Sequence, residues 1–257
     1  MTTLRPDGID VTRPSPARVY DYLLGGKDNY SVDRQAAEHF LAEWPEVAVN
    51  ARANRAWMVR TVGYLARGAG IDQFLDIGSG LPTADNLHQV AQRITPGARV
   101  VYVDNDPIVL AHGRAILEDN VGSRYFEGDA RKPDEIVDRA AEHLAMDRPV
   151  AVLLTSVLHY VPGDPAEVTG RLMDRCAPGS YLAVAHITTE GASPRLLERI
   201  SEQFNGGLIP RPTSEIERVF AGLELVAPGL VQVQDWRPDT AGERSELRLL
   251  GGVARKP

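Results

Sequence analysis

The spacing of apolar positions along the chain changes at about residue 70. From residue 17 to that point, apolar side chains recur at helical spacing, at Val47, Ala51, Trp57, Val59, Val62 and Leu65. The breaker Gly68-Ala69-Gly70 ends the run. Residues 1–16 carry four proline and glycine breakers with little periodicity, Pro6, Gly8, Pro14 and Pro16. The pattern predicts a flexible arm over residues 1–16 and a helical segment over residues 17–70.

Beyond residue 70, short apolar stretches alternate with amphipathic ones. The apolar stretches predict strands at residues 73–77, 98–103, 123–127, 149–155 and 180–187. The amphipathic ones predict helices at residues 87–94, 107–119, 136–145, 166–176 and, after Ser193-Pro194, up to Gly206-Gly207. Such alternation is typical of a mostly parallel sheet covered by helices on both faces. Residues 224–236 and 247–254 predict a closing antiparallel hairpin, so we expect one α/β domain over residues 17–257 with its core at 71–257.

Composition narrows the class of protein. Hydrophobic residues make up 43% and charged residues 25% of the 257, as in ordinary globular proteins. The formal charge of −7 opposes binding to nucleic acid, because phosphate contacts usually need clustered Lys and Arg. With Cys176 as the single cysteine, no signal-peptide pattern and no apolar run near the ~20 residues that span a bilayer, we expect a cytoplasmic protein without membrane association.

The segment at residues 74–80 (FLDIGSG) predicts a strand that enters a glycine-rich turn. Glycines such as Gly78 and Gly80 let a backbone approach a ligand closely, and ligands of such sheets bind at the carboxyl ends of strands. A dinucleotide site would favour glycine at position 83, where this chain has Thr83. Asp76 would repel a pyrophosphate but accept hydrogen bonds from an ammonium group, which favours S-adenosylmethionine. A nicotinamide-dependent oxidoreductase, or a tight turn without a ligand, stays as an alternative.

Acidic residues also end the next two predicted strands. Asp104 lies where a carboxylate can accept both ribose hydroxyls, although capping of the following helix by Asp104 or Asp106 would explain the same residues. Asp129 could accept a hydrogen bond from the adenine amine while the neighbouring backbone reads the ring edge. Any one of these residues is common in turns, so their placement after three successive strands carries the argument.

Two further segments carry candidate chemistry. Gly25 and Gly26 suit a lid that lies against a ligand, with a helix C-cap as the alternative. His159 could act as a general base in the segment at residues 155–160 (TSVLHY), although a packed, hydrogen-bonded histidine is the interpretation that we favour. His186 and Glu190 are weaker candidates for contacts with an acceptor. No metal-ligand spacing and no nucleophile-elbow motif is present, which argues against a zinc enzyme or a serine hydrolase.

The motifs at residues 74–80, 101–106 and 128–129 resemble the consecutive cofactor motifs of class I S-adenosylmethionine-dependent methyltransferases. A narrower resemblance rests on residues 16–33 (PARVYDYLLGGKDNYSVD), 54–56 (NRA), 75–83 (LDIGSGLPT) and 153–160 (LLTSVLHY). These look like the largely actinobacterial S-adenosyl methyltransferase family first catalogued as a domain of unknown function. The resemblance covers nearly the whole chain. Leu81-Pro82 departs from the broader pattern, because many members have a third glycine there.

The resemblance implies a Rossmann-like, seven-stranded, mostly parallel methyltransferase sheet with a C-terminal antiparallel hairpin and an N-terminal helical cap and lid over the cofactor. It also implies a methyltransferase that uses S-adenosyl-L-methionine, but it does not supply the acceptor; the formal charge of −7 favours a small-molecule acceptor. A non-catalytic S-adenosylmethionine-binding protein is the alternative, and a homodimer is left open.

Arg52 or Arg55 would pair with the cofactor carboxylate unless each is an ordinary surface arginine. The catalytic candidates are His159 and Tyr160. The expected cofactor-binding residues are Tyr20, Gly25, Gly26, Lys27, Arg55, Asp76, Gly78, Ser79, Gly80, Asp104, Asn105, Asp129, Ala130 and Thr155.

Overall fold

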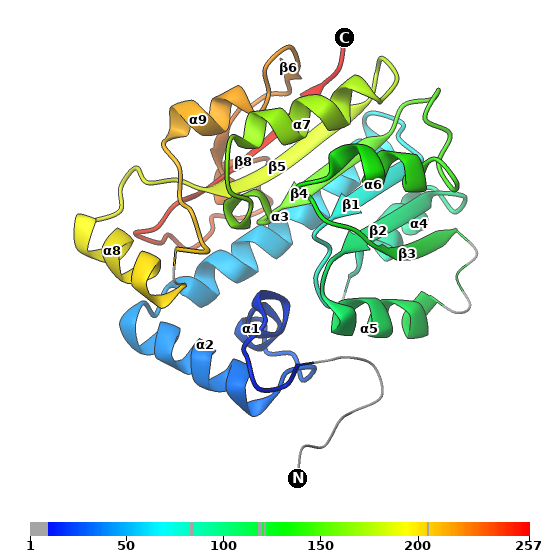
Figure 1. Ribbon diagram of the computed structural model, residues 1–257. Coiled ribbons are helices and arrows are strands. Elements are labelled where there is room, and N and C mark those ends of the chain that lie inside the picture. The colour runs from blue at the N-terminus through cyan, green and yellow to red at the C-terminus, as the bar shows by residue number, and fades with distance from the viewer. Residues whose placement is uncertain (1–9, 83–84, 118–119, 121, 205) are drawn as a thin grey trace.

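A twisted sheet with helices on both faces forms the body of the protein (Figure 1). The computed structural model describes residues 10–82, 85–117, 120, 122–204 and 206–257. Within them the strand order is β3-β2-β1-β4-β5-β8-β6, and β7 also pairs with β8. The strands are β1 (Gln73–Ile77), β2 (Arg99–Asp104), β3 (Ser123–Glu127), β4 (Ala151–Thr155), β5 (Tyr181–Ile187), β6 (Glu224–Leu225), β7 (Val231–Gln232) and β8 (Leu249–Arg255). The first five pair in parallel, and β8 runs antiparallel to β5, β6 and β7. The predicted fold class is confirmed.

Strand residues alternate between the two faces of the sheet and build two separate cores. Phe74 and Val100 pack beneath α3 (Val47–Arg67) and α4 (Leu87–Ile94). Leu75 and Val101 pack on the other face beneath α6 (Pro133–Ala140) and α7 (Pro165–Asp174). Because both faces are covered, nearly every position of β1, β4 and β5 is buried, which explains their continuous apolar sequence. The other helices that follow β2 are α5 (Pro107–Leu117), α8 (Pro194–Gln203) and α9 (Thr213–Arg218), with short 3₁₀ turns η1 (Leu158–Tyr160) and η2 (Val233–Asp235).

Two glycines in β8 bring aromatic rings close to the sheet. A Cβ at Gly251 would lie 2.8 Å from the Trp57 ring of α3, and a Cβ at Gly252 would lie 2.8 Å from the Phe220 ring beyond α9. Successive strand residues face opposite sides, so the two rings press on the strand backbone from both faces. Residues with a side chain at either position would push these layers apart.

The predicted N-terminal helical segment consists of three helices. α1 (Pro16–Leu23) and α2 (Ser31–Glu43) pack on each other, and α3 runs across the sheet beside them (Figure 1). Of the predicted arm, residues 1–9 lie outside the described residues. Residues 10–15 lead into α1, whose first residue is Pro16, a position where the missing N–H of proline costs nothing.

The prediction of one long strand over residues 224–236 is wrong. The structure has the two short strands β6 and β7, which pair with β8 at separate points. Pro228, which has no N–H to donate, and Gly229, at φ 94°, lie between them and interrupt the ladder. β6 and β7 together therefore take the place of one expected strand. The predicted helix at residues 136–145 is also displaced, because α6 begins at Pro133 and ends at Ala140.

None of the helices in the described part of the chain combines the length and apolar character that a bilayer span requires. In that same part, no cluster of three or more His, Cys, Asp or Glu side chains could hold a metal ion.

Candidate functional site

The glycine turn after β1 is hydrogen-bonded to the end of β2. The N–H groups of Gly78 and Ser79 donate to the Val103 carbonyl at 2.8 and 3.2 Å. The Gly80 N–H donates to Oδ2 of Asp104 at 2.8 Å. The parallel register of β1 and β2 places these two strand ends side by side, as the predicted cofactor site requires.

Gly78 is required by both conformation and space. Its φ of 71° lies in the left-handed region, and a Cβ there would lie 2.2 Å from Cγ2 of Val157, which follows β4. Gly80 also has a positive φ, 65°. The turn after β1 therefore lies directly against the segment after β4, and no larger residue fits at position 78.

Asp76 presents a carboxylate oxygen without a partner. The residue is 6% exposed, and its Oδ1 has no hydrogen-bond partner among the described residues. Burial raises its pKa to about 7; the nearby Arg55 opposes this shift and Asp104 adds to it. A buried, unpartnered carboxylate oxygen suits a cationic ligand group, because an unpaired buried charge is costly.

Asp104 is held by backbone donors at the end of β2. Besides the Gly80 N–H, it accepts a hydrogen bond from the Asp106 N–H at 2.9 Å. Burial raises its pKa, while these backbone bonds oppose the shift. Asp106 accepts from the Ile108 N–H at 3.0 Å, so the prediction that Asp106 caps α5 is confirmed. Asn105 between them is exposed.

Asp129 follows β3, but its carboxylate binds Arg131 in this structure. Nε of Arg131 lies 2.9 and 2.8 Å from its two carboxylate oxygens. This hydrogen bond lowers the pKa of Asp129 and keeps it ionised at neutral pH. Gly128 approaches β2 closely, since a Cβ there would lie 2.5 Å from Cγ1 of Val103. Asp129 and Ala130 are half-buried at the same end of the sheet.

The glycines at 25 and 26 end α1. The Gly26 N–H donates to the Asp21 carbonyl and the Gly25 N–H to the Tyr22 carbonyl, both at 2.9 Å, which is the Schellman arrangement. Gly25 has a φ of 78°, and a Cβ at Gly26 would lie 2.0 Å from the Asp21 carboxylate. The C-cap alternative therefore accounts for both glycines. Lys27 is exposed, and the lid stays a prediction.

Tyr20 lies on α1 and Arg55 on α3. The Tyr20 hydroxyl donates to the Ala51 carbonyl and accepts from Nδ2 of Asn54, both at 2.9 Å. Burial raises the pKa of Tyr20, so its phenol stays protonated. Arg55 donates to the Asp85 carbonyl at 2.6 Å. Arg52 forms an exposed ion pair with Glu243, the surface role that we kept as its alternative.

The segment after β4 contains Thr155 and His159. Thr155 ends the strand half-buried, and Ser156 turns the chain at a φ of 61°. His159 is 2% exposed; burial, with His186 and Arg211 nearby, lowers its pKa well below the usual value. The imidazole is therefore neutral and a weak base at pH 7, in keeping with the packed interpretation. Burial raises the pKa of Tyr160 beside it.

His186 and Glu190 have structural partners. Nδ1 of His186 lies 2.8 Å from the Ile187 carbonyl, and Nε2 lies 3.1 Å from the buried Arg211 guanidinium. These contacts assign the proton to Nδ1. Glu190 accepts from the N–H of Thr213, the first residue of α9, at 2.9 Å. Their contacts explain these two side chains without an acceptor.

Sequence reasoning missed two tyrosines in the floor of the site. The register places Asp76 beside Tyr102, and Tyr102 beside Tyr125, on one face of the sheet. The two phenol rings stack with centroids 4.5 Å apart, and the Tyr102 hydroxyl accepts from the His88 N–H at 2.8 Å. Alternation along β2 puts Tyr102 on the face of Asp104, and that signal could have identified it.

A hollow of about 810 Å³ lies elsewhere, at the amino-terminal ends of β2 and β3. Gln92, Arg99, Arg124 and His143 contribute to its lining. In parallel sheets ligands bind at the opposite edge, so we place the site at the carboxyl ends of the strands.

The sheet order, the antiparallel last strand and the acidic residues at the carboxyl ends of β1, β2 and β3 define a class I methyltransferase architecture. The model of the S-adenosyl methyltransferase family matches residues 2–257. The chain belongs to this family, and its cofactor is S-adenosyl-L-methionine. Membership decides against the nicotinamide alternative.

Two solved structures resemble the whole chain. A DUF574 family protein from Streptomyces avermitilis is 42% identical, with a TM-score of 0.90 over 96% of this chain and 99% of that one. A putative methyltransferase from Thermobifida fusca is 41% identical, with a TM-score of 0.91 over 99% of both chains. The N-methyltransferase NodS from Bradyrhizobium japonicum is 13% identical with a TM-score of 0.51, covering 82% of this chain and 99% of that one, and shares the fold alone. No curated protein matches the sequence.

Proposed function

We propose that this protein is an S-adenosylmethionine-dependent methyltransferase that acts on a small-molecule acceptor. The observation that carries the proposal is the orphaned Oδ1 of Asp76, buried beside a glycine turn that no larger residue could form. An ammonium group is a suitable partner for such an oxygen. The residues present therefore fit the amino-acid end of the cofactor.

Residues at the carboxyl ends of three strands would each bind a different part of the cofactor. Asp76 would accept the ammonium group, and Asp104 the ribose hydroxyls, with its backbone donors holding the carboxylate in place. Asp129 and the backbone at Ala130 would meet the adenine edge. The bound cofactor supplies a methyl group on a positively charged sulfur, and the protein supplies position and electrostatics.

On the acceptor side, the side chains favour alignment over proton transfer. His159 is neutral and weakly basic, and the phenols of Tyr20 and Tyr160 hold their protons because burial raises each pKa. These groups can shape the site and exclude water around a nucleophile that reacts without a strong base. The net charge of −7 favours a small acceptor over a polyanion.

Calorimetric titration with S-adenosylmethionine and S-adenosylhomocysteine tests the proposal. We expect saturable binding in the micromolar range, about −8 kcal/mol, and a loss of about tenfold or more in Asp104→Ala. Asp72→Ala is the matched control, because Asp72 precedes β1 at the opposite edge and pairs with Arg148 on the surface. Asp104→Asn keeps the shape of the side chain should the alanine variant fold poorly.

Absence of binding to the folded wild-type protein would contradict the proposal. Binding without methylation of any acceptor in a broad small-molecule screen would instead favour a non-catalytic S-adenosylmethionine-binding protein. Equal affinity in Asp104→Ala and Asp72→Ala would remove Asp104 from the site.

A further inference from the structure

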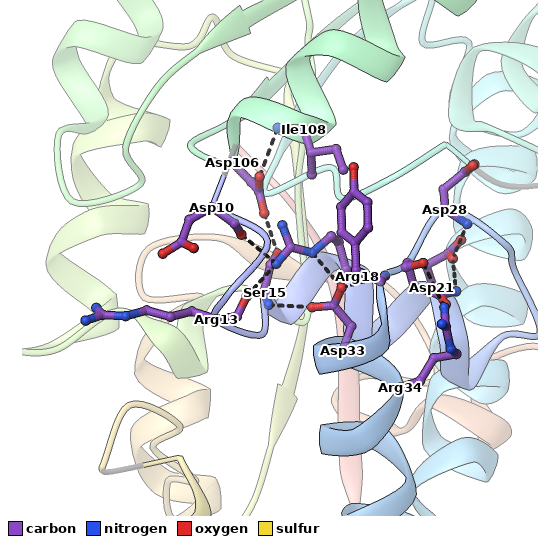
Figure 2. A network of polar contacts seen from close by, with 12 residues as sticks. Asp10, Arg13, Ser15, Arg18, Asp21, Asp28, Asp33, Arg34, Asp106 and Ile108 are labelled. Atoms are coloured by element: carbon purple, nitrogen blue, oxygen red, sulfur yellow. Dashed lines mark hydrogen bonds and ion pairs between the residues drawn. The ribbon is translucent and has the colours of Figure 1, made fainter. Parts of the chain in front are cut away.

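The N-terminal segment reaches the loop that directly follows Asp104, the last residue of β2. The Ser15 hydroxyl donates to a carboxylate oxygen of Asp106, the residue that caps α5 (Figure 2). The Asp106 N–H in turn donates to Oδ1 of Asp104 at 2.9 Å. Asp106 thus links Ser15 to the predicted ribose carboxylate of Asp104, although Ser15 and Asp106 are 91 positions apart in the sequence.

A buried ion pair holds Ser15 in place. Asp33, at the start of α2, is fully buried and accepts from the Ser15 N–H at 3.0 Å, Nε of Arg18 at 2.8 Å and the Tyr30 N–H at 2.8 Å (Figure 2). Arg18 is 2% exposed and also donates to the Arg13 carbonyl at 2.6 Å. A buried pair with its other hydrogen bonds satisfied fixes one geometry of the chain, and here it fixes where the Ser15 hydroxyl points.

Apolar contacts join the same segment to both cofactor loops. Ala17 and Tyr30 pack against a buried apolar cluster formed by Leu81, which follows the glycine turn, and by Ile108 and Val109 of α5. The segment at residues 10–33 therefore packs on a cluster to which the loop after β1 and helix α5 both contribute.

We infer that Ser15 is a positioning residue of the cofactor site, whose hydroxyl couples the docking of residues 10–33 to the conformation of the loop that directly follows Asp104. Docking of the segment and binding at the site then strengthen each other, because linkage between two equilibria is reciprocal. Asp33 and Arg18 act one step further away by holding Ser15. The inference rests on the proposed function, since it assumes that a ligand occupies Asp104.

Ser15→Ala tests this role without removing a helix cap. Ser15 is the N-cap residue of α1, but its side chain makes no capping hydrogen bond, so helix α1 should not depend on its hydroxyl. We expect the affinity for S-adenosylhomocysteine, measured by calorimetry, to fall about fivefold or more, as expected for a lost hydrogen bond to a charged group. Ser15→Thr restores a hydroxyl and should restore the affinity to within about twofold.

Thr12→Ala is the matched control. It removes a hydroxyl from the same segment, one that bonds only the neighbouring Asp10 within the described residues, and should leave the affinity unchanged. Hydrogen exchange supplies the second readout. S-adenosylhomocysteine should slow exchange over residues 10–33 in the wild type and in Thr12→Ala, and less so in Ser15→Ala, while the melting temperatures of the unliganded variants agree.

Each outcome decides one claim. If the wild type binds the ligand and Ser15→Ala binds it equally well, the inference is wrong and the proposed function stands. If Ser15→Ala and Ser15→Thr lose affinity equally, together with melting temperature, the role of Ser15 is structural and the inference is again wrong. If the wild type binds neither S-adenosylmethionine nor S-adenosylhomocysteine, the proposed function fails and the inference fails with it.

Discussion

The Asp76 carboxyl lies in surroundings that oppose its own charge. Burial raises its pKa to about 7, Asp104 adds to the effect, and only Arg55 opposes it. The unfolded chain would ionise the same group near its ordinary value. Ionisation of Asp76 therefore weakens the unliganded fold, and the property that suits this residue to a cation also costs stability.

Asp76→Asn should stabilise the unliganded protein at high pH. The pKa of Asp76 is higher in the folded protein than in the unfolded chain, so protonation of Asp76 stabilises the fold. This stabilisation is complete below the ordinary pKa of the carboxyl group and is lost as the pH rises through about 7. At pH 8 the wild type bears the full cost, roughly 2 to 4 kcal/mol, which the amide avoids. The melting temperature of the variant should exceed that of the wild type by several degrees at pH 8, and the difference should disappear towards pH 4.

Ligand affinity should follow pH in the opposite direction. Binding of S-adenosylhomocysteine to the wild type should weaken as pH falls through about 7, because a protonated Asp76 no longer attracts an ammonium group. Asp76→Asn should bind weakly at every pH. A wild-type affinity that is flat between pH 5.5 and 8.5 would show that Asp76 does not meet the cation.

Residues of the site differed in how readily the sequence identified them. Asp76, Gly78 and Asp104 lie in short motifs, and the neighbouring residues in the sequence are enough to predict their roles. Tyr102 required knowledge of which strand face the site uses. The contact of Ser15 with Asp106 depends on tertiary docking across 91 positions, which no local pattern encodes.

Among the elements, the turn from β1 to α4 and the segment around η1 depend on each other. Gly78 lies against Val157, so the two loops that border the site fit only when position 78 has no side chain.

Gly78→Ala should both destabilise the protein and abolish cofactor binding. The added methyl would meet Val157 at 2.2 Å in a left-handed conformation, so we expect a loss of about 2 to 4 kcal/mol in the free energy of unfolding. Urea denaturation and calorimetry measure the two effects.

The variant Gly70→Ala separates the cost of a left-handed backbone conformation from the cost of a steric clash. Gly70 has a φ of 69°, but no atom lies within 4 Å of an added Cβ. The loss in the free energy of unfolding of Gly70→Ala should therefore stay near 1 kcal/mol. Equal losses in the two variants would show that the contact with Val157 is unimportant.

The sequence predicted which segments form helices and strands better than it predicted where each of them begins and ends. Strands β1, β2, β4 and β5 follow from apolar runs, because burial on both faces leaves a strong signal. The strand over residues 224–236 was predicted too long, because Pro228 and Gly229 were given too little weight against the apolar residues around them. The start of α6 was placed three residues late, although Pro133 is a common first helical residue.

At the scale of the whole molecule, α3 joins the N-terminal and C-terminal parts of the chain. Nδ2 of Asn50 donates to the Leu247 carbonyl at 2.6 Å, and Arg60 donates to the Val233 carbonyl at 2.6 Å. Trp57 is fully buried between them, with Trp236 edge-on at 6.4 Å. The alternation of elements predicted the sheet, but these long-range contacts could not be predicted from it.

Trp57→Ala should therefore destabilise the entire fold. Removal of a fully buried indole that contacts the backbone of β8 should cost about 3 to 5 kcal/mol, measured by urea denaturation. Leu225→Ala on β6 is the control, because Leu225 is 45% exposed and should change stability by less than about 1 kcal/mol. A small effect of Trp57→Ala would indicate that α3 is dispensable for the core.

The two sides of the site are held to the sheet in different ways. Gly251 leaves room for the Trp57 ring against the backbone of β8, so α3, which also carries Asn54 and Arg55, packs directly on the sheet. Residues 10–33 instead dock on α3 through Tyr20, on Asp106 through Ser15, and on an apolar cluster through Ala17 and Tyr30. We therefore expect substitutions in this docked segment to change the residence time of a bound ligand while the sheet stays untouched.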